Sequence, residues 1–461
     1  MRLRFLSLLI PLFLSSCLTY YQQNAAFQSK FEAGQLDEAE KVLAKIKEKD
    51  LRKTLVLYKL NQGVVYSLLG DYKTSNSFFE EAYLLTEDYQ KNYVNEAASF
   101  FLNPNMVVYK PEMHEKILIH YYKAINYLKL GQSDEALVEC KRINIETEEY
   151  NQLYTSTKKM KDDAFAHNLM GIIYQSNGDY NNAFIAYRNA YNIYKTTYSE
   201  FFKVGPPDQL IKDLLFTAYK TGFNDEVSFY ERETGRKLEV YSKNGNGEAV
   251  FFWNDGLGPV KDQFAINFVV VRGQGGVVMF QNDELGLSFP FFISDEDYKS
   301  SGLGDLNIYR VVFPKYVERP LAYTSGSLSV NNASFPLDLG MDINQVSFKS
   351  LQDRMLTEMG KSLLRFALKK ALEMQIRKKD QTAGALVGIF DALVENADTR
   401  NWQTLPHSVF YTRASLPEGK QNAELLMNGP KGNKKVDLSF DIKKGTTSFY
   451  NYYSLDYMSK Q

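Results

Sequence analysis

A recurring pattern of small and aromatic residues in the first half of the chain constrains the fold more than any other feature. Its clearest copy begins at Gly171, where a tyrosine follows after three residues and a Gly-Asp-Tyr triplet begins after seven. A second copy begins at Gly63 with the same spacing, a third lies at 124–143, and a weaker one lies at 27–46. The positions that this pattern predicts to pack are Gly63, Tyr66, Gly70, Tyr72, Ala82, Ala124, Tyr127, Gly131, Ala136, Gly171, Tyr174, Gly178, Tyr180, Ala183, Tyr187 and Ala190.

Pairs of antiparallel helices explain the spacing. A residue without a side chain, such as Gly63 or Gly171, lets two helices touch, and a later glycine, such as Gly178, ends the first helix in left-handed backbone. Each copy resembles a tetratricopeptide (TPR) repeat, and such repeats stack into curved surfaces that bind other proteins. We therefore predict that residues 24–232 form an all-α, TPR-like solenoid that serves interaction rather than catalysis.

The array is not regular. The glycines that end the first helices are Gly34, Gly70, Gly131 and Gly178, at intervals of 36, 61 and 47 residues, whereas a regular array repeats about every 34 residues. The longest insertion covers roughly 88–112. It is expected to form either a loop on the binding face or a longer, ordered helix pair, and the sequence leaves both open.

The start of the chain has the features of a targeting segment. Two arginines precede a ten-residue apolar stretch at 5–14, and Leu14-Ser15-Ser16-Cys17 follows. This motif resembles a bacterial lipobox, which implies that residues 1–16 are a signal peptide, that Cys17 carries lipid, and that 17–23 form a tether. The alternative is an ordinary signal peptide with an incidental cysteine. Leu18 after the cysteine favours the outer membrane, facing the periplasm, over the inner membrane.

Composition and motifs argue against several classes of function. The net charge is −1 and the pI is about 6.5, which does not favour a nucleic-acid partner. The second cysteine, Cys140, falls at a packing position, and a lipidated Cys17 would leave it without a disulfide partner, so neither a disulfide nor a redox role is expected. The four histidines do not have metal-ligand spacing, and no hydrolase elbow or phosphate loop occurs. We expect no enzyme activity, no cofactor and no metal. The histidines are His114, His120, His167 and His407.

Near residue 236 the hydrophobic period changes from that of helices to that of strands. Residues 236–461 are predicted to form a β-rich, sandwich-like domain, with a helical hairpin inserted at about 346–396. The whole chain is thus an α+β multidomain protein. The predicted strands are 248–253, 263–272, 276–281, 287–293, 307–313, 321–330, 409–414, 422–427, 435–441 and 447–452.

Two loops of the β-rich region are candidate contact sites. One joins two strands at 256–261, and the other joins a helix to a strand at 398–406. In one interpretation both loops contribute to a contact surface. In the other, Asp398 pairs with Arg400 to cap a helix, and the tryptophan fills the edge of the core. The residues concerned are Gly256, Gly258, Pro259, Lys261, Asp398, Arg400 and Trp402.

Nearly all of the chain after Cys17 resembles an uncharacterised family of Gram-negative TPR lipoproteins. The residues that carry the resemblance are Gly256–Lys261, Phe313–Pro320, Ala397–Trp402 with Leu405-Pro406, and Arg413 with Leu416–Gly419. The resemblance implies no catalytic residue. It implies a cell-envelope assembly in which other envelope proteins, among them neighbouring small lipoproteins, are partners.

Two hypotheses for function follow, and a third, an enzyme site hidden in the β-rich half, has no cluster of polar residues in the sequence to support it. The first is a lipid-anchored scaffold in the bacterial envelope that binds other proteins through its TPR-like repeats. The second is a peptidoglycan- or glycan-binding protein that uses the β-rich half, where Tyr450, Tyr452 and Tyr453 could stack on sugars.

Overall fold

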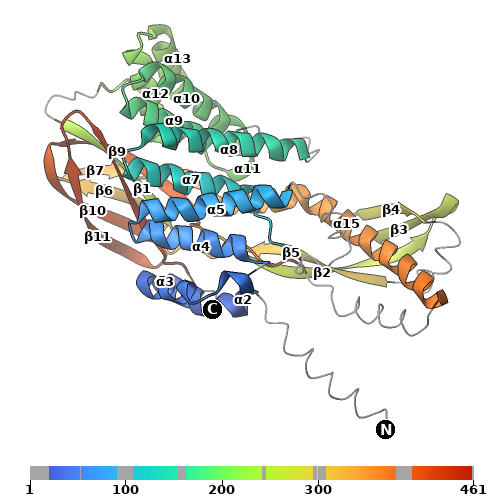
Figure 1. The fold of residues 1–461 in the computed structure, drawn as a ribbon. Helices are drawn as coiled ribbons and strands as arrows, with labels where there is room; N and C mark the ends of the chain where they lie inside the picture. The colour runs from blue at the N-terminus through green and yellow to red at the C-terminus, as the bar shows by residue number, and fades with distance from the viewer. Residues whose placement is uncertain are drawn as a thin grey trace.

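The computed structural model describes residues 20–51, 53–90, 107–153, 162–240, 246–293, 298, 308–379 and 397–458. The predicted signal peptide, Cys17 and most of the insertion at 88–112 therefore lie outside the described residues, as does the second helix of the predicted hairpin. Figure 1 shows a stack of helices, sheets beside it, and an arm of strands and a long helix that projects from the body.

The N-terminal half is a stack of helical hairpins, as the sequence predicted. Its helices are α2 (Tyr20–Glu32), α3 (Leu36–Ala44), α4 (Leu55–Leu68), α5 (Tyr72–Gln90), α7 (Met113–Lys129), α8 (Ser133–Leu153), α9 (Ala164–Ser176), α10 (Tyr180–Ile193), α11 (Ser199–Phe202), α12 (Asp208–Lys220) and α13 (Asn224–Thr234).

Close contacts within each hairpin explain the glycine pattern. A β-carbon added to Gly63 would lie 2.5 Å from the ring of Phe79, and one added to Gly171 would lie 2.4 Å from the ring of Tyr187. Gly70 and Gly178 end their helices in left-handed backbone, with φ of +85° and +79°. The local signals of the repeats thus fix where each hairpin turns and how closely its helices approach.

The described part of the C-terminal half contains three four-stranded sheets. Their strands are β1 (Asn246–Asp255), β2 (Val260–Arg272), β3 (Val277–Asn282), β4 (Leu287–Phe292), β5 (Ile308–Val317), β6 (Ser325–Val330), β7 (Ala333–Pro336), β8 (Asp338–Asp342), β9 (Ser408–Pro417), β10 (Gly419–Gly429), β11 (Gly432–Ile442) and β12 (Thr447–Ser454).

Two of these sheets pack face to face. One has the order β12-β1-β9-β8 and the other β11-β10-β6-β7. The core between them contains Phe251, Trp253, Leu425 and Phe440. This pair is the sandwich that the sequence predicted, because alternating side chains of each sheet point into one shared core.

The third sheet, β4-β3-β2-β5, forms the arm together with α15 (Ile343–Lys379). The sequence placed these four strands in the sandwich, which was wrong. Strands β2 and β5 pair along ten residues, from Val260–Val317 to Val269–Ile308. They pack on α15, where Phe366 stacks on Tyr309 with ring centroids 3.4 Å apart. The arm thus has a core of its own, and periodicity alone does not reveal that.

The segment between β5 and α15 also differs from the prediction. One strand was expected at 321–330, but β6 begins only at Ser325, and the short strands β7 and β8 follow before α15. Leu321 instead makes an isolated bridge to Tyr457. Short strands such as these carry too few residues for a clear alternation, so the sequence did not indicate them.

The largest core spans both halves of the chain. It joins solenoid residues such as Phe79 and Tyr122 to Val250 and Tyr411 of the sandwich and to Trp402. The helical stack and the sandwich are therefore packed into one body along the sheet β12-β1-β9-β8.

Candidate functional site

One face of the helical stack is covered by the chain itself. We call it the inner face, and it is lined by the first helices of successive hairpins, α4, α7, α9 and α12. The sheet β12-β1-β9-β8 lies against this face, and so does the segment 397–407, which we call the seam loop. Both loops that the sequence singled out meet here, since Gly258 N donates to Leu405 O at 2.8 Å.

Trp402 is the centre of the seam loop and is 1% exposed. Its ring packs against Phe79 of α5 and Tyr122 of α7, with centroids 5.8 and 5.9 Å away. Its indole N–H donates to Thr404 at 2.8 Å, and the hydroxyl of Thr404 reaches Asn61 of α4 at 3.1 Å. The loop therefore fills the inner face with both apolar and polar contacts.

The start of the seam loop is fixed by an arginine. The Arg400 guanidinium donates two bonds to the carboxylate of Asp398, at 2.8 and 2.7 Å. It also donates to the carbonyls of Lys53 and Val107, each at 3.0 Å. The pairing of Asp398 with Arg400 was one of the two interpretations of the sequence. The bonds from Arg400 to the solenoid were not expected.

The loop at 256–261 is held from the other side. Asn401 donates to Pro259 O at 2.8 Å and accepts from Lys261 N at 3.1 Å. Gly256 has a φ of +65°, and a β-carbon there would lie 2.6 Å from Leu321. The candidate contact loops thus form a surface that the chain itself covers, and their buried side chains are not open to a second molecule.

A cluster of buried charges lies below the seam loop. Glu112, at the N-terminus of α7, pairs with Lys261 and with Arg354 of α15. Burial alone would raise the pKa of Glu112, but the two cations outweigh it and lower that pKa to about 2. The solenoid, strand β2 and helix α15 therefore meet at one carboxylate.

Glu115, one turn further along α7, is held in a different state. Its carboxylate accepts from Trp402 N at 2.7 Å and from the hydroxyl of Tyr109. Burial, and then the charge of Glu112, raise the pKa of Glu115 to about 7. This side chain connects the solenoid to the backbone of the seam loop.

A second buried ion pair joins the last hairpins to the sandwich. Arg413 of β9 contacts Asp213 of α12 at 3.2 Å and Glu248 of β1 at 2.9 Å, and it donates to the hydroxyl of Tyr187 at 3.2 Å. Burial opposes the charge of Arg413, but Asp213, Tyr187 and Glu248 together raise its pKa. The arginine stays charged and joins β9 to α10, α12 and β1.

Asp255, at the end of β1, is a buried carboxyl group whose protonation makes the stability of the protein depend on pH. Its Oδ1 accepts from Ser454 at 2.5 Å, while no donor among the described residues reaches its buried Oδ2. Burial raises the pKa of Asp255 to about 7, above the ordinary value of about 3.9. The folded protein then holds this proton more tightly than the unfolded chain, so stability is lost as the pH rises from about 4 to about 7.

The substitution Asp255→Asn removes this charge and keeps the acceptor for Ser454. We expect it to stabilise the protein at pH 8 by on the order of 2 kcal/mol and to have little effect at pH 4.5. Thermal unfolding at both pH values measures the difference. Asp437→Asn, at an exposed position of β11, is the matched control. An equal effect of Asp255→Asn at both pH values would contradict the assignment.

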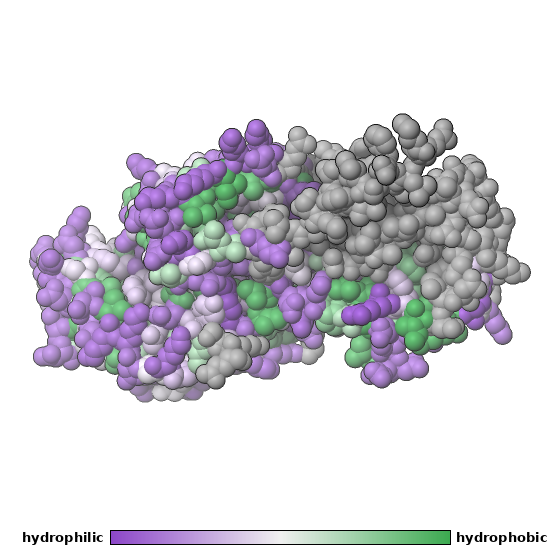
Figure 2. Space-filling model, turned by 90° about the horizontal axis from the view of Figure 1, so that it is seen from below, coloured by the Kyte–Doolittle hydropathy of each residue, from purple (hydrophilic) through white to green (hydrophobic). Residues whose placement is uncertain are grey.

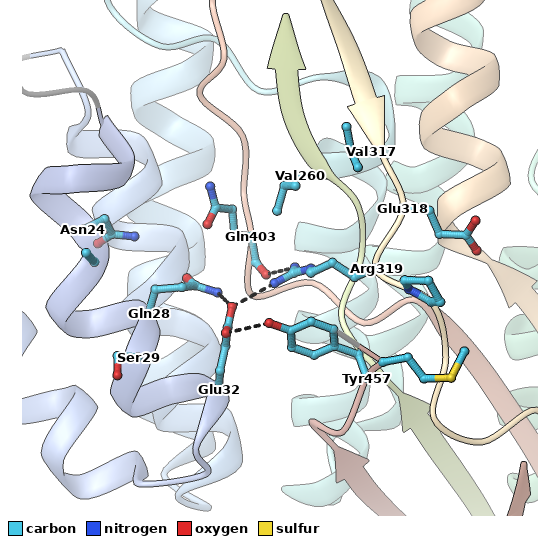
Figure 3. Close-up of a pocket in the computed structure, with 13 residues that line it drawn as sticks. Asn24, Gln28, Ser29, Glu32, Val260, Val317, Glu318, Arg319, Gln403 and Tyr457 are labelled. Carbon is cyan, nitrogen blue, oxygen red and sulfur yellow. Dashed lines mark hydrogen bonds and ion pairs between the residues drawn. The ribbon is translucent and has the colours of Figure 1, made fainter. Parts of the chain in front are cut away.

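An arginine at the edge of the seam loop borders a cavity of about 640 Å³. Arg319 donates to Gly258 O at 2.6 Å, to Gln403 O at 2.5 Å and to Glu32 of α2 at 3.1 Å. Tyr457 donates to the same carboxylate at 3.0 Å. Figure 3 shows how these side chains meet at the wall of the cavity. The cavity lies between α2 and the foot of the arm, by which we mean the start of β2 at Val260 and the end of β5 at Val317.

The predicted packing residues differ in how deeply the structure buries them. Ala82, Ala124, Ala136, Ala183, Tyr187 and Ala190 are fully buried, while Tyr66, Tyr72, Tyr127, Tyr174 and Tyr180 are partly exposed.

Cys140 is buried, and burial raises the pKa of its thiol above the usual range. The four histidines are buried apart from one another. Within the described residues, no group of histidine, cysteine or carboxylate side chains could hold a metal ion, and no helix is long and apolar enough to cross a membrane.

Several residues of this site were not predicted. Glu112 and Glu115 form a capping box at the start of α7, and the spacing of two glutamates before an apolar run is a signal that could have indicated the helix start. Arg319 and Arg413 lie in the segments that carry the family resemblance, but their partners are 61 to 287 residues away in the sequence. No local pattern reveals such pairs.

No protein-family model matches the chain, and no curated protein matches it significantly. Its helical half is similar to solved structures of TPR-repeat proteins. A crystal structure of MamA is 15% identical, with 48% of this chain and 96% of that chain covered and a TM-score of 0.29. The apo form of RapI is 14% identical, covering 46% and 68%, with a TM-score of 0.32. BtubC (BKLC) from P. vanneervenii is 14% identical, covering 48% and 83%, with a TM-score of 0.31. Similarity at this level carries no information on function.

Proposed function

We propose that this protein is a lipid-anchored scaffold of the bacterial cell envelope, held through Cys17 at the outer membrane and facing the periplasm. In this proposal the TPR-like solenoid and the sandwich form a rigid base, and the arm binds an envelope protein. The observation that carries the proposal is the outer face of the arm sheet, which is apolar and whose described residues are partly or largely exposed.

Each strand of the arm sheet has apolar side chains on both faces. On one face, Phe268, Phe280 and Val311 pack beneath α15. On the opposite face, Val269 and Ile308 lie side by side as a cross-strand pair, and Ile308 is 61% exposed. The other apolar residues of this outer face are Ala265, Val271, Val277, Met279, Pro290, Phe292 and Val312.

An antiparallel sheet with one solvated face normally carries polar residues there. Here Phe292 is 79% exposed, and Figure 2 shows hydrophobic surface on the arm beside the grey atoms. Apolar patches of this kind mark interaction sites. Since the inner face of the solenoid is covered, the arm is the surface that we assign to the partner.

The test uses the full-length, lipidated protein in its own membranes. A photo-crosslinking phenylalanine analogue is placed at Phe292 or Ile308, and at Ile145 of α8 as an exposed control on the solenoid. We expect one discrete protein adduct from the arm positions and none from Ile145. Adding Arg310→Asp on the same face should weaken that adduct, and Cys17→Ser should release the protein from the membrane fraction.

Two results would contradict the proposal. Adducts with phospholipid alone would make the arm a membrane-contacting element, and equal adducts from Ile145 would show that the arm is not selective. The glycan-binding alternative has no specific observation in its favour. The ring of Tyr450 packs on Phe440 with centroids 4.2 Å apart, and the hydroxyl of Tyr453 donates to Thr404 O at 3.1 Å.

A further inference from the structure

We infer that the cavity between α2 and the foot of the arm binds a peptide segment through one of its secondary amide groups. This would be a second docking point of the scaffold, and it does not depend on the outer face of the arm. The cavity is open on one side and has a volume of about 640 Å³, which is within the range of small-ligand pockets.

The walls of the cavity come from four parts of the chain. Helix α2 forms one wall. The start of β2 and the end of β5 form the opposite wall (Figure 3). The seam loop and the segment 457–458 complete it. The apolar side chains that line it are Ala25, Val260, Val317, Pro320 and Met458. An apolar pocket with a few polar groups is the usual form of a binding site.

The charged groups at the cavity are already paired. Arg319 and Glu32 bind each other at 3.1 Å, and each has further partners within the chain. Glu318, on the rim, contacts His407 at 3.2 Å. A ligand of this cavity is therefore recognised through neutral hydrogen bonds rather than through a charge.

Two glutamine side chains supply such bonds. Gln403 is 4% exposed, and no acceptor among the described residues reaches its Nε2. Gln28 donates its Nε2 to Glu32 at 2.8 Å, but its buried Oε1 meets no donor among the described residues. Figure 3 shows the side chain of Gln403 extending from the seam loop toward α2, which carries Gln28.

A buried polar atom without a partner costs about 1–3 kcal/mol in stability. Among the described residues the cavity therefore has one donor and one acceptor without a partner, and these are the two kinds of group that the C=O and N–H of a secondary amide need. The apolar walls suit the aliphatic side chain next to such an amide in a peptide. The ring of Tyr457 lies against Arg319, with the guanidinium 5.6 Å from its centroid, so it offers less surface to a sugar ring.

The first probe is N-acetyl-alanine methylamide, and binding is followed by saturation-transfer NMR with the mature protein. The deciding variant is Gln403→Met, because the bond from Arg319 goes to the main-chain carbonyl of Gln403 and survives the change. Gln152→Met is the matched control, since Gln152 lies exposed on α8 and bonds to Glu148 four residues earlier. N-acetylglucosamine, which carries the same amide on a sugar, is the second probe.

We expect saturation transfer to the peptide probe, binding about tenfold weaker in Gln403→Met, and unchanged binding in Gln152→Met. The melting temperature of Gln403→Met should equal or exceed that of the unmodified protein, because an unpaired buried group is removed. The inference is overturned by no transfer at millimolar probe, by equal binding in Gln403→Met, or by transfer to the sugar alone. None of these outcomes changes the crosslinks from the arm, so the two proposals fail separately.

Discussion

Replacing Trp402 with alanine is expected to lower the free energy of unfolding by about 3–5 kcal/mol, the usual cost of removing a fully buried tryptophan. The ring fills the space between Phe79 and Tyr122, so its loss leaves a cavity at the centre of the inner face. The bond from the indole to Thr404 is lost as well. The hydrogen bond from the backbone N–H of residue 402 to Glu115 does not involve the side chain. The variant therefore loses the packing of the ring but keeps this anchor of the loop.

Urea unfolding measures this effect. The chain has two tryptophans, so fluorescence of Trp402→Ala reports on Trp253 in the sandwich alone, while circular dichroism reports mainly on the helices. We expect the two signals to separate in the variant and to coincide in the unmodified protein. Phe292→Ala, at an exposed aromatic residue, should change stability by no more than about 0.5 kcal/mol. A similar small effect for Trp402→Ala would contradict the role given to the seam loop.

The second large effect is expected at Arg413. The substitution Arg413→Met leaves Asp213 and Glu248 buried without their cation, which costs about 3–5 kcal/mol. The loss should be greatest at neutral pH. It should shrink as the pH falls, because both carboxylates then take up protons and lose the charge that lacks a partner.

A matched rescue separates charge from packing. Adding Asp213→Asn and Glu248→Gln to Arg413→Met makes the site neutral, and we expect the triple variant to regain most of the stability at pH 7. Thermal unfolding at pH 5 and pH 7 gives the comparison. If the triple variant is as unstable as Arg413→Met, the arginine acts by filling space and not by pairing charge.

The sequence predicted those parts of the fold that depend on neighbouring residues. Gly63 and Gly171 indicated the close hairpins, because the need for a residue without a side chain arises within one repeat. The strands of the sandwich followed from the alternation of apolar and polar residues. The arm was missed because a strand pattern does not say which sheet a strand joins. Its position depends on the pairing of β2 with β5 and on packing against α15.

The candidate site shows the same limit. Trp402, Asp398 and Arg400 were singled out as a loop with two interpretations, and their covering by the solenoid depends on partners hundreds of residues away. The atoms of Gln28 and Gln403 that have no partner among the described residues could not be predicted, since a glutamine in a sequence carries no sign of its surroundings.

The central claim is that the inner face of the solenoid is occupied by the chain's own seam loop, and hydrogen exchange of the mature protein tests it most directly. The backbone N–H of Trp402 donates to Glu115, so its protection requires a docked loop. Mass spectrometry of peptides covering 397–407 and α7 should show slow exchange in both, and faster exchange of the loop in Trp402→Ala. Rapid exchange of 397–407 in the unmodified protein, with α7 still protected, would mean that the inner face is open and would contradict the account.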